Sequence, residues 1–181
     1  MIYNEMDSYT GKTFNPMKIC EDDICIEDIA HSLALMCRGS GQLLYFYSVA
    51  QHSLNCAYEA MARGYDKKHI LACLLHDASE GYIADIIRPV KRHLKDYYVI
   101  EEMIMDVIFQ KYHLNDIDKK LWREIDNDML ENELKVMLKN HENDKVPLLK
   151  SNPDFHEKNY KEVEQKFLCL ANKLINEVKI I

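Results

Sequence analysis

The sequence predicts an all-α fold, a helical bundle of about six or more helices in a single domain over residues 1–181. Apolar residues recur every three or four positions through most of the chain, which is the period of helices with one buried face. The chain is 48% hydrophobic and has only 5 glycines and 4 prolines, which favours ordered helices over turn-rich or disordered structure. A length of 181 residues suits one domain with a sizeable core.

The N-terminal segment, residues 1–25, has no helical period. It contains the turn signals Tyr9-Thr10-Gly11-Lys12 and Asn15-Pro16, so we expect a loop or a short hairpin there. Residues 26–140 form the expected helical core, and residues 141–181 form a polar connection followed by a C-terminal helix. The apolar spacing predicts helices over residues 26–37, 49–63, 67–80, 94–113, 115–140 and 155–180.

Local residues predict several of the helix ends. Gly39 and Gly41 follow the first helix and are expected to end it. Ser48 is a good N-cap for the second helix, and Gly64 is its expected stop. Asp66 is the expected N-cap of the third helix, which is the most apolar segment of the chain.

The formal net charge of −7 argues against stable nucleic-acid binding, because binding to a phosphate backbone requires concentrated Lys and Arg. A small anionic substrate remains compatible with this charge if a metal and a few local cations outweigh it. The chain has no apolar run of about 18 residues, and its first 30 residues carry too many acids for a signal peptide. We therefore expect a cytoplasmic protein that does not enter a membrane.

The six cysteines, at positions 20, 25, 37, 56, 73 and 169, are dispersed and include no Cys-x-x-Cys pair. Several lie within helical patterns, where a reduced cysteine behaves as a small apolar residue. Cys20 and Cys25 could bind a metal together, but no second pair of ligands accompanies them. The pattern favours structural thiols and a reducing compartment.

The segment Leu71 to Glu80 carries the clearest chemical signal. His76 and Asp77 stand side by side at the end of an apolar helical run, and Glu80 follows one turn later. On the predicted helix the Asp77 carboxylate lies at the edge of the buried face, where it costs several kcal/mol unless a cation or hydrogen-bond donors meet it. We therefore expect a positive charge close to Asp77.

Two further polar residues lie on or beside apolar helix faces. Asp126 falls in the middle of the inward face predicted for residues 115–140, whereas Asp128 points away from that face. His52 lies on the border of the inward face of the second helix, where a lone histidine is usually structural. Together with His76 and Asp77 they form a mixed nitrogen and oxygen set, which suits a divalent transition metal with open positions for water.

Cations near these residues allow two interpretations. Arg38, at the predicted end of the first helix, could interact with the helix dipole, or it could bind a phosphate with its planar guanidinium. Arg88 and Lys91 flank Pro89 in a turn that follows Asp85, and they could lend charge to a bound anion or be surface cations.

The order of a histidine, a His-Asp pair and a distant aspartate resembles the pattern of the HD-domain phosphohydrolases, which implies the HD-domain helical bundle. The resemblance is greatest to the small 5′-deoxynucleotidase branch and covers roughly residues 26 to 140. Residues Tyr9 to Phe14 also resemble the opening of small HD hydrolases found in bacteria and phages. The residues that carry the resemblance are Arg38, Ser48-Val49-Ala50-Gln51-His52-Ser53, His76-Asp77-Ala78-Ser79-Glu80, Asp85, Arg88-Pro89-Val90-Lys91 and Asp126, with Leu130 and Glu133 after it.

The resemblance implies roles for individual residues. Glu80 would position or deprotonate the attacking water, and Asp85 would orient the sugar or assist the leaving oxygen. Arg38 would bind the phosphoryl group, with Arg88 and Lys91 as further substrate-binding cations. One position departs from the family, because Gly39 stands where an aromatic residue is expected next to the arginine. The implied metal ligands are His52, His76, Asp77 and Asp126.

The implied activity is metal-dependent hydrolysis of a nucleotide phosphoester, with a deoxynucleoside 5′-monophosphate as the first candidate substrate. Two alternatives stay open: a triphosphohydrolase of deoxynucleoside triphosphates or another HD phosphoester hydrolase, and a non-catalytic nucleotide-binding regulatory module. The expected cofactor is one divalent ion of manganese, cobalt, iron, zinc or nickel. Members of such families often form homodimers, so a homodimer is also an expectation.

Overall fold

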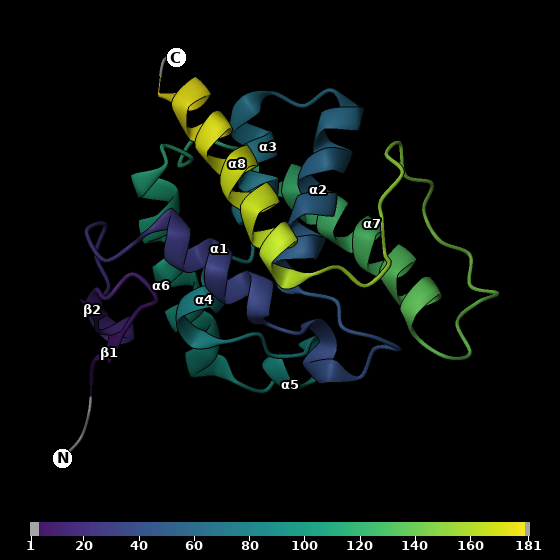
Figure 1. Cartoon of the computed structure of the whole chain (residues 1–181), viewed down its shortest axis with the longest axis horizontal. Coiled ribbons are helices and arrows are strands. Elements are labelled where there is room, and N and C mark those ends of the chain that lie inside the picture. Colours follow the sequence, from purple (N-terminus) through teal and green to yellow (C-terminus); the bar gives the residue numbers. More distant parts are fainter. Residues whose placement is uncertain (1–3, 180–181) are drawn as a thin grey trace.

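The computed structural model describes residues 4–179, and its regular secondary structure is helical apart from one small hairpin (Figure 1). The all-α prediction is therefore confirmed. The strands are β1 (Met6–Asp7) and β2 (Thr13–Phe14), and the helices are α1 (Ile26–Leu35), α2 (Val49–Arg63), α3 (Lys67–Leu75), α4 (Glu80–Ile83), α5 (Arg88–Lys91), α6 (Lys95–Lys111), α7 (Lys119–Met137) and α8 (Tyr160–Val178). Within the described residues, no helix is both long and apolar enough to cross a membrane.

The N-terminal segment forms the hairpin that its turn signals predicted. The two strands pair antiparallel with Met6 opposite Phe14, and the positive φ of Gly11 (84°) permits the turn between them. The hairpin is fixed to α1 because the Asp28 carboxylate accepts hydrogen bonds from the backbone and the hydroxyl of Thr10. Residues 1–3 of this predicted segment lie outside the described residues.

The predicted caps of α2 and α3 are confirmed. The side chain of Ser48 accepts a hydrogen bond from the backbone N–H of Gln51, and Asp66 accepts one from His69. At the other end of α2, Gly64 takes the left-handed conformation with φ 82°. These caps fix both ends of α2 and the beginning of α3.

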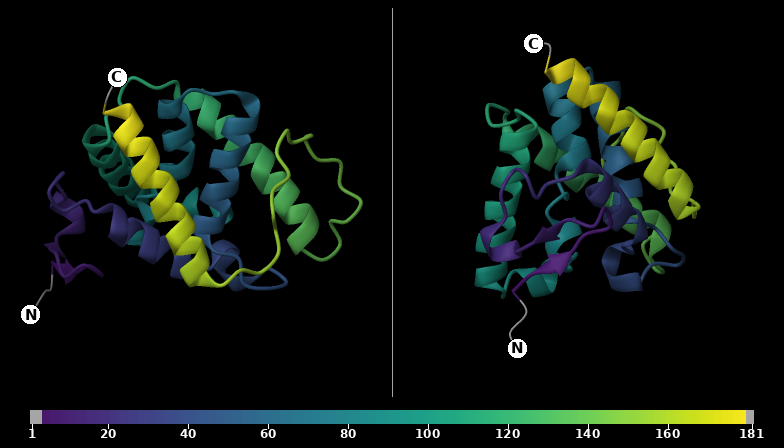
Figure 2. Two further views of the ribbon diagram at one scale, coloured as in Figure 1. Left: turned by 45° about the horizontal axis from the view of Figure 1, so that its top comes forward. Right: turned by 60° about the vertical axis from the view of Figure 1, so that its left-hand side comes forward.

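The core forms where α2 packs against α3 and α7, while α8 crosses α1 and α3 and also contacts α2. Figure 1 shows α8 running diagonally over these helices, and the two views of Figure 2 show the hairpin beside the bundle. Ile29, Leu33, Leu71, Leu74 and Phe167 are fully or almost fully buried between them. The meeting of α2, α3 and α7 brings His52 on α2 and Asp126 on α7 close to the end of α3, which His76 and Asp77 follow.

The predicted third helix is interrupted, so its extension to Glu80 is wrong. The helix α3 ends at Leu75, residues 76–79 form turns, and Glu80 begins the separate short helix α4. The backbone N–H groups of Ala78 and Glu80 bond to carbonyls three residues earlier instead of four. As a result His76 and Asp77 lie just beyond the end of α3, on a tight turn.

Other helix ends also differ from the prediction. The first helix ends at Leu35, and Gly39 and Gly41 lie in a separate 3₁₀ turn, Arg38–Gly41. Helix α7 begins later than predicted because Asp118 is its N-cap, and α8 begins at Tyr160 because Asn159 is its N-cap. The predicted end of the last helix at Ile180 lies outside the described residues.

A long connection, residues 138–159, joins α7 to α8 and lies on α2. The side-chain amides of Gln51 and Asn55 both donate to the backbone carbonyl of Asp154. One turn further along α2, the buried Glu59 carboxylate accepts hydrogen bonds from the backbone N–H groups of Lys150 and Ser151. A polar stripe on α2, with residues four positions apart, therefore anchors this connection.

Candidate metal centre

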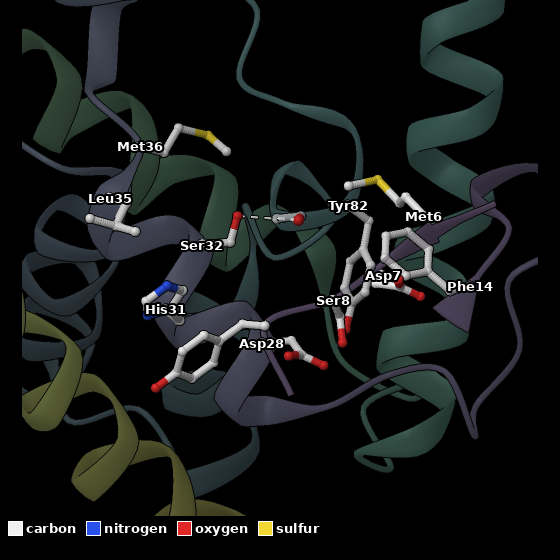
Figure 3. Close-up of a pocket in the computed structure, with 12 residues that line it drawn as sticks. Met6, Asp7, Ser8, Phe14, Asp28, His31, Ser32, Leu35, Met36 and Tyr82 are labelled. Atoms are coloured by element: carbon white, nitrogen blue, oxygen red, sulfur yellow. Dashed lines mark hydrogen bonds between the residues drawn. The ribbon is translucent and has the colours of Figure 1, made fainter. Parts of the chain in front are cut away.

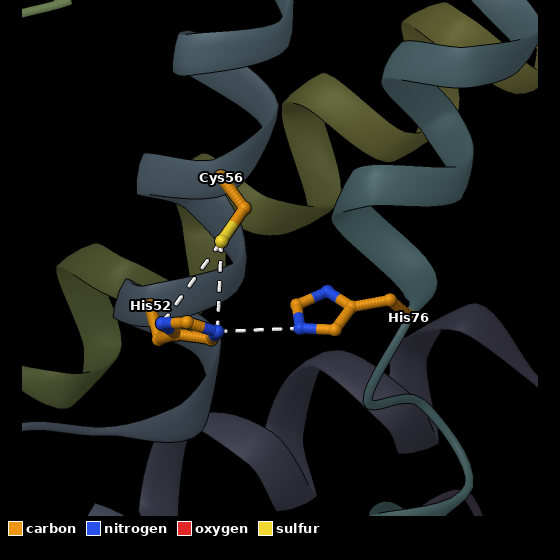
Figure 4. Close-up of side chains that lie close together, drawn as sticks. All are labelled: His52, Cys56 and His76. Atoms are coloured by element: carbon orange, nitrogen blue, oxygen red, sulfur yellow. Dashed lines mark hydrogen bonds between the residues drawn. The ribbon is translucent and has the colours of Figure 1, made fainter. Parts of the chain in front are cut away.

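Two histidines from different elements meet in the interior. His52 lies on α2 and is fully buried, and His76 follows α3 with only 6% of its surface exposed. Their Nε2 atoms face each other at 3.2 Å (Figure 4). The packing of α2 against α3 brings these two imidazoles together.

The other ring nitrogen of each histidine has its own partner. His52 Nδ1 lies 2.6 Å from Glu133 Oε1, and His76 Nδ1 lies 2.8 Å from the carbonyl oxygen of Cys73. An ionised carboxylate and a carbonyl can only accept hydrogen bonds, so both Nδ1 atoms are assigned as donors. In neutral rings the two facing Nε2 atoms then both carry lone pairs, which require a proton or a metal ion between them.

Glu133 is ionised in this setting. Burial alone would raise its pKa, but His52 and Arg38 outweigh burial and hold the pKa of Glu133 below its ordinary value. Its Oε1 atom also accepts a hydrogen bond from the Tyr47 hydroxyl at 2.9 Å.

Two carboxylates complete the cluster. Asp77 Oδ2 lies 3.3 Å from His76 Nε2 and 3.9 Å from His52 Nε2. Asp126 Oδ1, from α7, lies 3.2 Å from His52 Nε2 and 3.7 Å from His76 Nε2. The structure therefore brings together the four predicted ligand residues from α2, the turn after α3, and α7.

The charges of the cluster reinforce one another. Burial opposes ionisation of Asp126 and Asp77, but the neighbouring histidines outweigh it and hold both carboxyl pKa values well below the ordinary range. Burial would lower the pKa of His76, yet Asp77 and Asp126 raise it well above its ordinary value. The two aspartates and His76 thus favour one another's charged forms.

Arg38 lies in the 3₁₀ turn beyond α1 and points into the same centre. Its Nε atom lies 3.0 Å from Glu133 Oε2, its Nη1 atom 3.3 Å from Asp77 Oδ2, and its Nη2 atom 3.7 Å from Asp126 Oδ1. The guanidinium thus contacts three carboxylates of the cluster instead of the end of α1. The interpretation of Arg38 as a partner of the helix dipole is wrong.

Arg88 and Lys91, on α5, lie beside the same cluster. Arg88 is half-exposed, and its guanidinium bonds to Asp126 Oδ2 at 2.5 Å and to the side chain of Asn127. Lys91 forms an ion pair with Glu101 of α6 and lies 3.7 Å from Glu80 Oε1. The interpretation as a surface cation is therefore wrong for Lys91, whereas Arg88 is a surface cation whose partner is Asp126.

Glu80 and Asp85 lie on the Lys91 side of the centre. Glu80 is 4% exposed, and no protein atom within residues 4–179 hydrogen-bonds its buried Oε2 atom. Burial, together with the charges of Asp77 and Asp85, raises the pKa of Glu80 well above its ordinary value. Burial also raises the pKa of Asp85, with Asp77 adding to this effect and Arg38 opposing it.

A buried cysteine adjoins the histidines, and His52, Cys56 and His76 form a group that could hold a metal ion. Cys56 Sγ lies 3.5 Å from His52 Nε2 and 4.0 Å from His52 Nδ1 (Figure 4). Burial raises the pKa of the Cys56 thiol well above its ordinary value, and nearby carboxylates add to this effect. All six cysteines are free thiols, as the sequence suggested.

Three residues beside the centre, Glu133, Tyr47 and Glu101, were not predicted from the sequence to have a role in it. For Glu133 a signal was available, because it follows Asp126 by seven residues and so lies two helical turns further along the same face of α7. Tyr47 precedes α2 in an irregular segment and gave no signal. Glu101 could not be distinguished from the other acids of α6.

A hollow of about 370 Å³ lies between the hairpin, α1 and α4 (Figure 3). Tyr9 stacks on His31 beside it, with ring centroids 3.7 Å apart. None of its lining residues is one of the predicted site residues, so this hollow is separate from the His-Asp centre.

Two curated proteins are similar to part of the chain. YfdR of Escherichia coli strain K12 is 45% identical over 107 residues, which cover 59% of this chain and 57% of that protein. RCAP_rcc00048 of Rhodobacter capsulatus is 42% identical over 98 residues, which cover 51% of this chain and 50% of that protein. Both are named as uncharacterized proteins, and this chain spans about half the length of these relatives. No protein-family model matches the chain.

Proposed function

We propose that this protein is a metal-dependent phosphohydrolase of the HD type, with His52, His76, Asp77 and Asp126 as ligands of one divalent transition metal ion. The observation that carries the proposal is the pair of facing Nε2 atoms, 3.2 Å apart, with a carboxylate oxygen on either side. Two imidazole nitrogens and two carboxylates converge in a largely buried place and offer four ligand atoms to a divalent ion, in addition to the ion pairs that Arg38 makes there.

The spacing of these atoms fits a metal ion. Bonds of about 2.0–2.2 Å from one ion place neighbouring ligand atoms about 3–4 Å apart. Five of the separations among the four ligand atoms lie between 3.2 and 3.9 Å. Mixed imidazole and carboxylate ligands suit manganese, cobalt, iron, zinc or nickel.

Cys56 fits less well as a ligand. Its sulfur is almost equally distant from the two ring nitrogens of His52, at 3.5 and 4.0 Å. An atom along the Nε2 lone pair would be much closer to Nε2 than to Nδ1. The sulfur therefore lies beside the ring and away from the direction in which His52 would bind a metal, and its raised pKa disfavours the thiolate that binding requires.

When bound, the ion would supply Lewis acidity, which polarises a phosphoryl oxygen and makes a water molecule more acidic. Glu80 would take the proton of that water at its Oε2 atom, which is buried and free of protein partners in the described part of the chain. The raised pKa of Glu80 makes its carboxylate a stronger proton acceptor than an ordinary glutamate. Asp85 would orient the sugar or assist the leaving oxygen.

Cations favour an anionic substrate at this place. The Arg38 side chain is 13% exposed, and its planar guanidinium could exchange its carboxylate partners for phosphoryl oxygens. Arg88 and Lys91 would add positive charge at the rim. We propose a deoxynucleoside 5′-monophosphate as the substrate, with a deoxynucleoside triphosphate as the second candidate.

Gly39 bears on the selectivity for the base. It takes the left-handed conformation with φ 64°, in which a larger L residue is strained. An aromatic residue at this position, as in the resembling family, would therefore carry about 1–2 kcal/mol of backbone strain. We accordingly propose no base preference.

One experiment tests the proposal. Metal-stripped protein is assayed with each divalent ion against a panel of nucleoside mono- and triphosphates, and released phosphate and triphosphate are measured separately. We expect phosphate release from deoxynucleoside 5′-monophosphates only when an ion is added. Release of triphosphate would favour the triphosphohydrolase, and nucleotide binding without any release would favour a regulatory module.

A further inference from the structure

A chain of buried hydrogen bonds leads from His52 away from the proposed metal. His52 Nδ1 lies 2.6 Å from Glu133 Oε1, and the same oxygen accepts the Tyr47 hydroxyl at 2.9 Å. The amide of Asn55 in turn donates to the Tyr47 hydroxyl oxygen at 2.9 Å. Each of these side chains is at most 5% exposed, so water does not compete for these bonds.

The direction of each bond in this chain is fixed. Because Asn55 Nδ2 can only donate, the Tyr47 oxygen is an acceptor there and its proton goes to Glu133. Glu133 receives three donors, since Arg38 Nε lies 3.0 Å from its second oxygen. A buried carboxylate that accepts three hydrogen bonds is held in one orientation.

We propose that Glu133 is a positioning residue of the metal centre, held in place by Tyr47 and Asn55. It accepts the Nδ1 proton of His52, so the Nε2 lone pair of His52 faces His76 and the two aspartates. This inference rests on the proposed function. It adds that metal affinity also depends on Glu133, which is not itself a ligand. Such partners of a ligating histidine typically change metal affinity by about 10- to 100-fold.

The connection of residues 138–159 takes part in the same network. Asn55, which holds Tyr47, also donates to the carbonyl of Asp154 at 3.2 Å. Glu59, one turn further along α2, is an equally buried acid that anchors Lys150 and Ser151, and its bonds do not include His52. Glu59 is therefore a matched control, because it supports the same connection without touching the metal centre.

The experiment measures Co²⁺ affinity and the visible absorption spectrum of bound Co²⁺ in the metal-stripped protein. Glu133→Gln should bind Co²⁺ about 10- to 100-fold more weakly with an altered spectrum, because an amide cannot accept bonds at both of its ends. Tyr47→Phe should weaken binding in the same direction by less, and it remains informative if Glu133→Gln does not fold. Glu59→Gln should keep the wild-type affinity and spectrum despite a lower melting temperature.

Two outcomes would overturn the inference. One is wild-type affinity and spectrum in folded Glu133→Gln, and the other is an equal loss of affinity in Glu59→Gln, which would show general destabilisation.

A second measurement separates this inference from the proposed function. The ¹⁵N NMR shifts of His52 in the metal-free protein report which ring nitrogen carries the proton. We expect Nδ1–H in the wild type and loss of that preference in Glu133→Gln. If the wild type binds no divalent ion, the proposed function fails, while this NMR comparison still decides whether Glu133 positions His52. An unchanged His52 pattern in Glu133→Gln overturns the positioning role.

Discussion

Two aspartates on α7 allow a sharp test of the ligand set. Asp126 Oδ1 faces His52 and His76, whereas Asp128, two residues later, points to the other side of the helix and bonds Arg63 at 2.7 Å. We predict that Asp126→Asn loses metal and activity and that Asp128→Asn keeps both. The two substitutions remove the same charge from the same helix, so each is the control for the other.

The magnitude follows from the charge that Asp126 contributes. The Asp126 carboxylate would lie at bond distance, about 2 Å, from a divalent ion, so the energy of two unit charges about 4 Å apart, about 4 kcal/mol at the effective dielectric constant typical near a protein surface, is a conservative figure for its attraction. Part of this is offset because the variant no longer holds a partly buried carboxylate in its charged form. At about 1.4 kcal/mol for each factor of ten, Asp126→Asn should weaken metal binding by about a hundredfold to a thousandfold.

Asp128→Asn should act on stability instead. Arg63 keeps its ion pairs with Glu59 and Glu124, so the loss should be about 1 kcal/mol or less. For a chain of this size that corresponds to a fall in melting temperature of about 2–4 °C.

The assay combines elemental analysis of metal content with calorimetric titration of metal-stripped protein, and thermal unfolding of the metal-free forms serves as the stability control. Equal effects of both substitutions on metal binding would show that the orientation of α7 is wrong. Undiminished affinity in Asp126→Asn would remove this residue from the ligand set.

Three further predictions follow from the same geometry. Glu80→Gln should retain metal but lower turnover by about a hundredfold or more, as for loss of a general base; lost metal would make Glu80 a ligand instead. Arg38→Lys should lower kcat/KM more than Arg88→Lys, because one ammonium cannot replace three guanidinium contacts; equal steady-state kinetics for the two variants would contradict this. Burial would raise the pKa of Glu59, but its hydrogen bonds to Lys150, Ser151 and Arg63 outweigh burial and lower the pKa to about 2. The ionised Glu59 carboxylate should therefore stabilise the fold by up to about 3 kcal/mol above pH 4.5. That stabilisation should be lost as the pH falls from about 4.5 towards 2, and urea unfolding at pH 7 and pH 3 should show a smaller pH dependence in Glu59→Gln.

Features that depend on neighbours within one or two helical turns could be predicted from the sequence. Ser48, Gly64 and Asp66 mark helix ends through bonds to residues at most four positions away. The inward position of Asp126 followed from helical phase, since the period of 3.6 residues decides which side chains share a face.

The tight turn at residues 76–79 was not predictable in the same way. The sequence from Leu71 to Glu80 has helical spacing throughout, and no proline or glycine interrupts it before Gly81. The helix nevertheless ends at Leu75. Helix propensities differ by less than about 1 kcal/mol per residue, so tertiary contacts can override them.

The sequence by itself determined the all-α class, most helix positions and which polar residues lie on buried faces. Only the tertiary structure decided which of these residues meet. The 3.2 Å contact of His52 with His76, the three carboxylates around Arg38 and the support of His52 by Glu133 all join residues at least 24 positions apart. Such contacts depend on how α2, α3 and α7 cross, and the crossing is set by the packing of whole helix faces. A charged residue on a predicted buried face indicates that it must have a partner, but which residue is that partner depends on the tertiary structure.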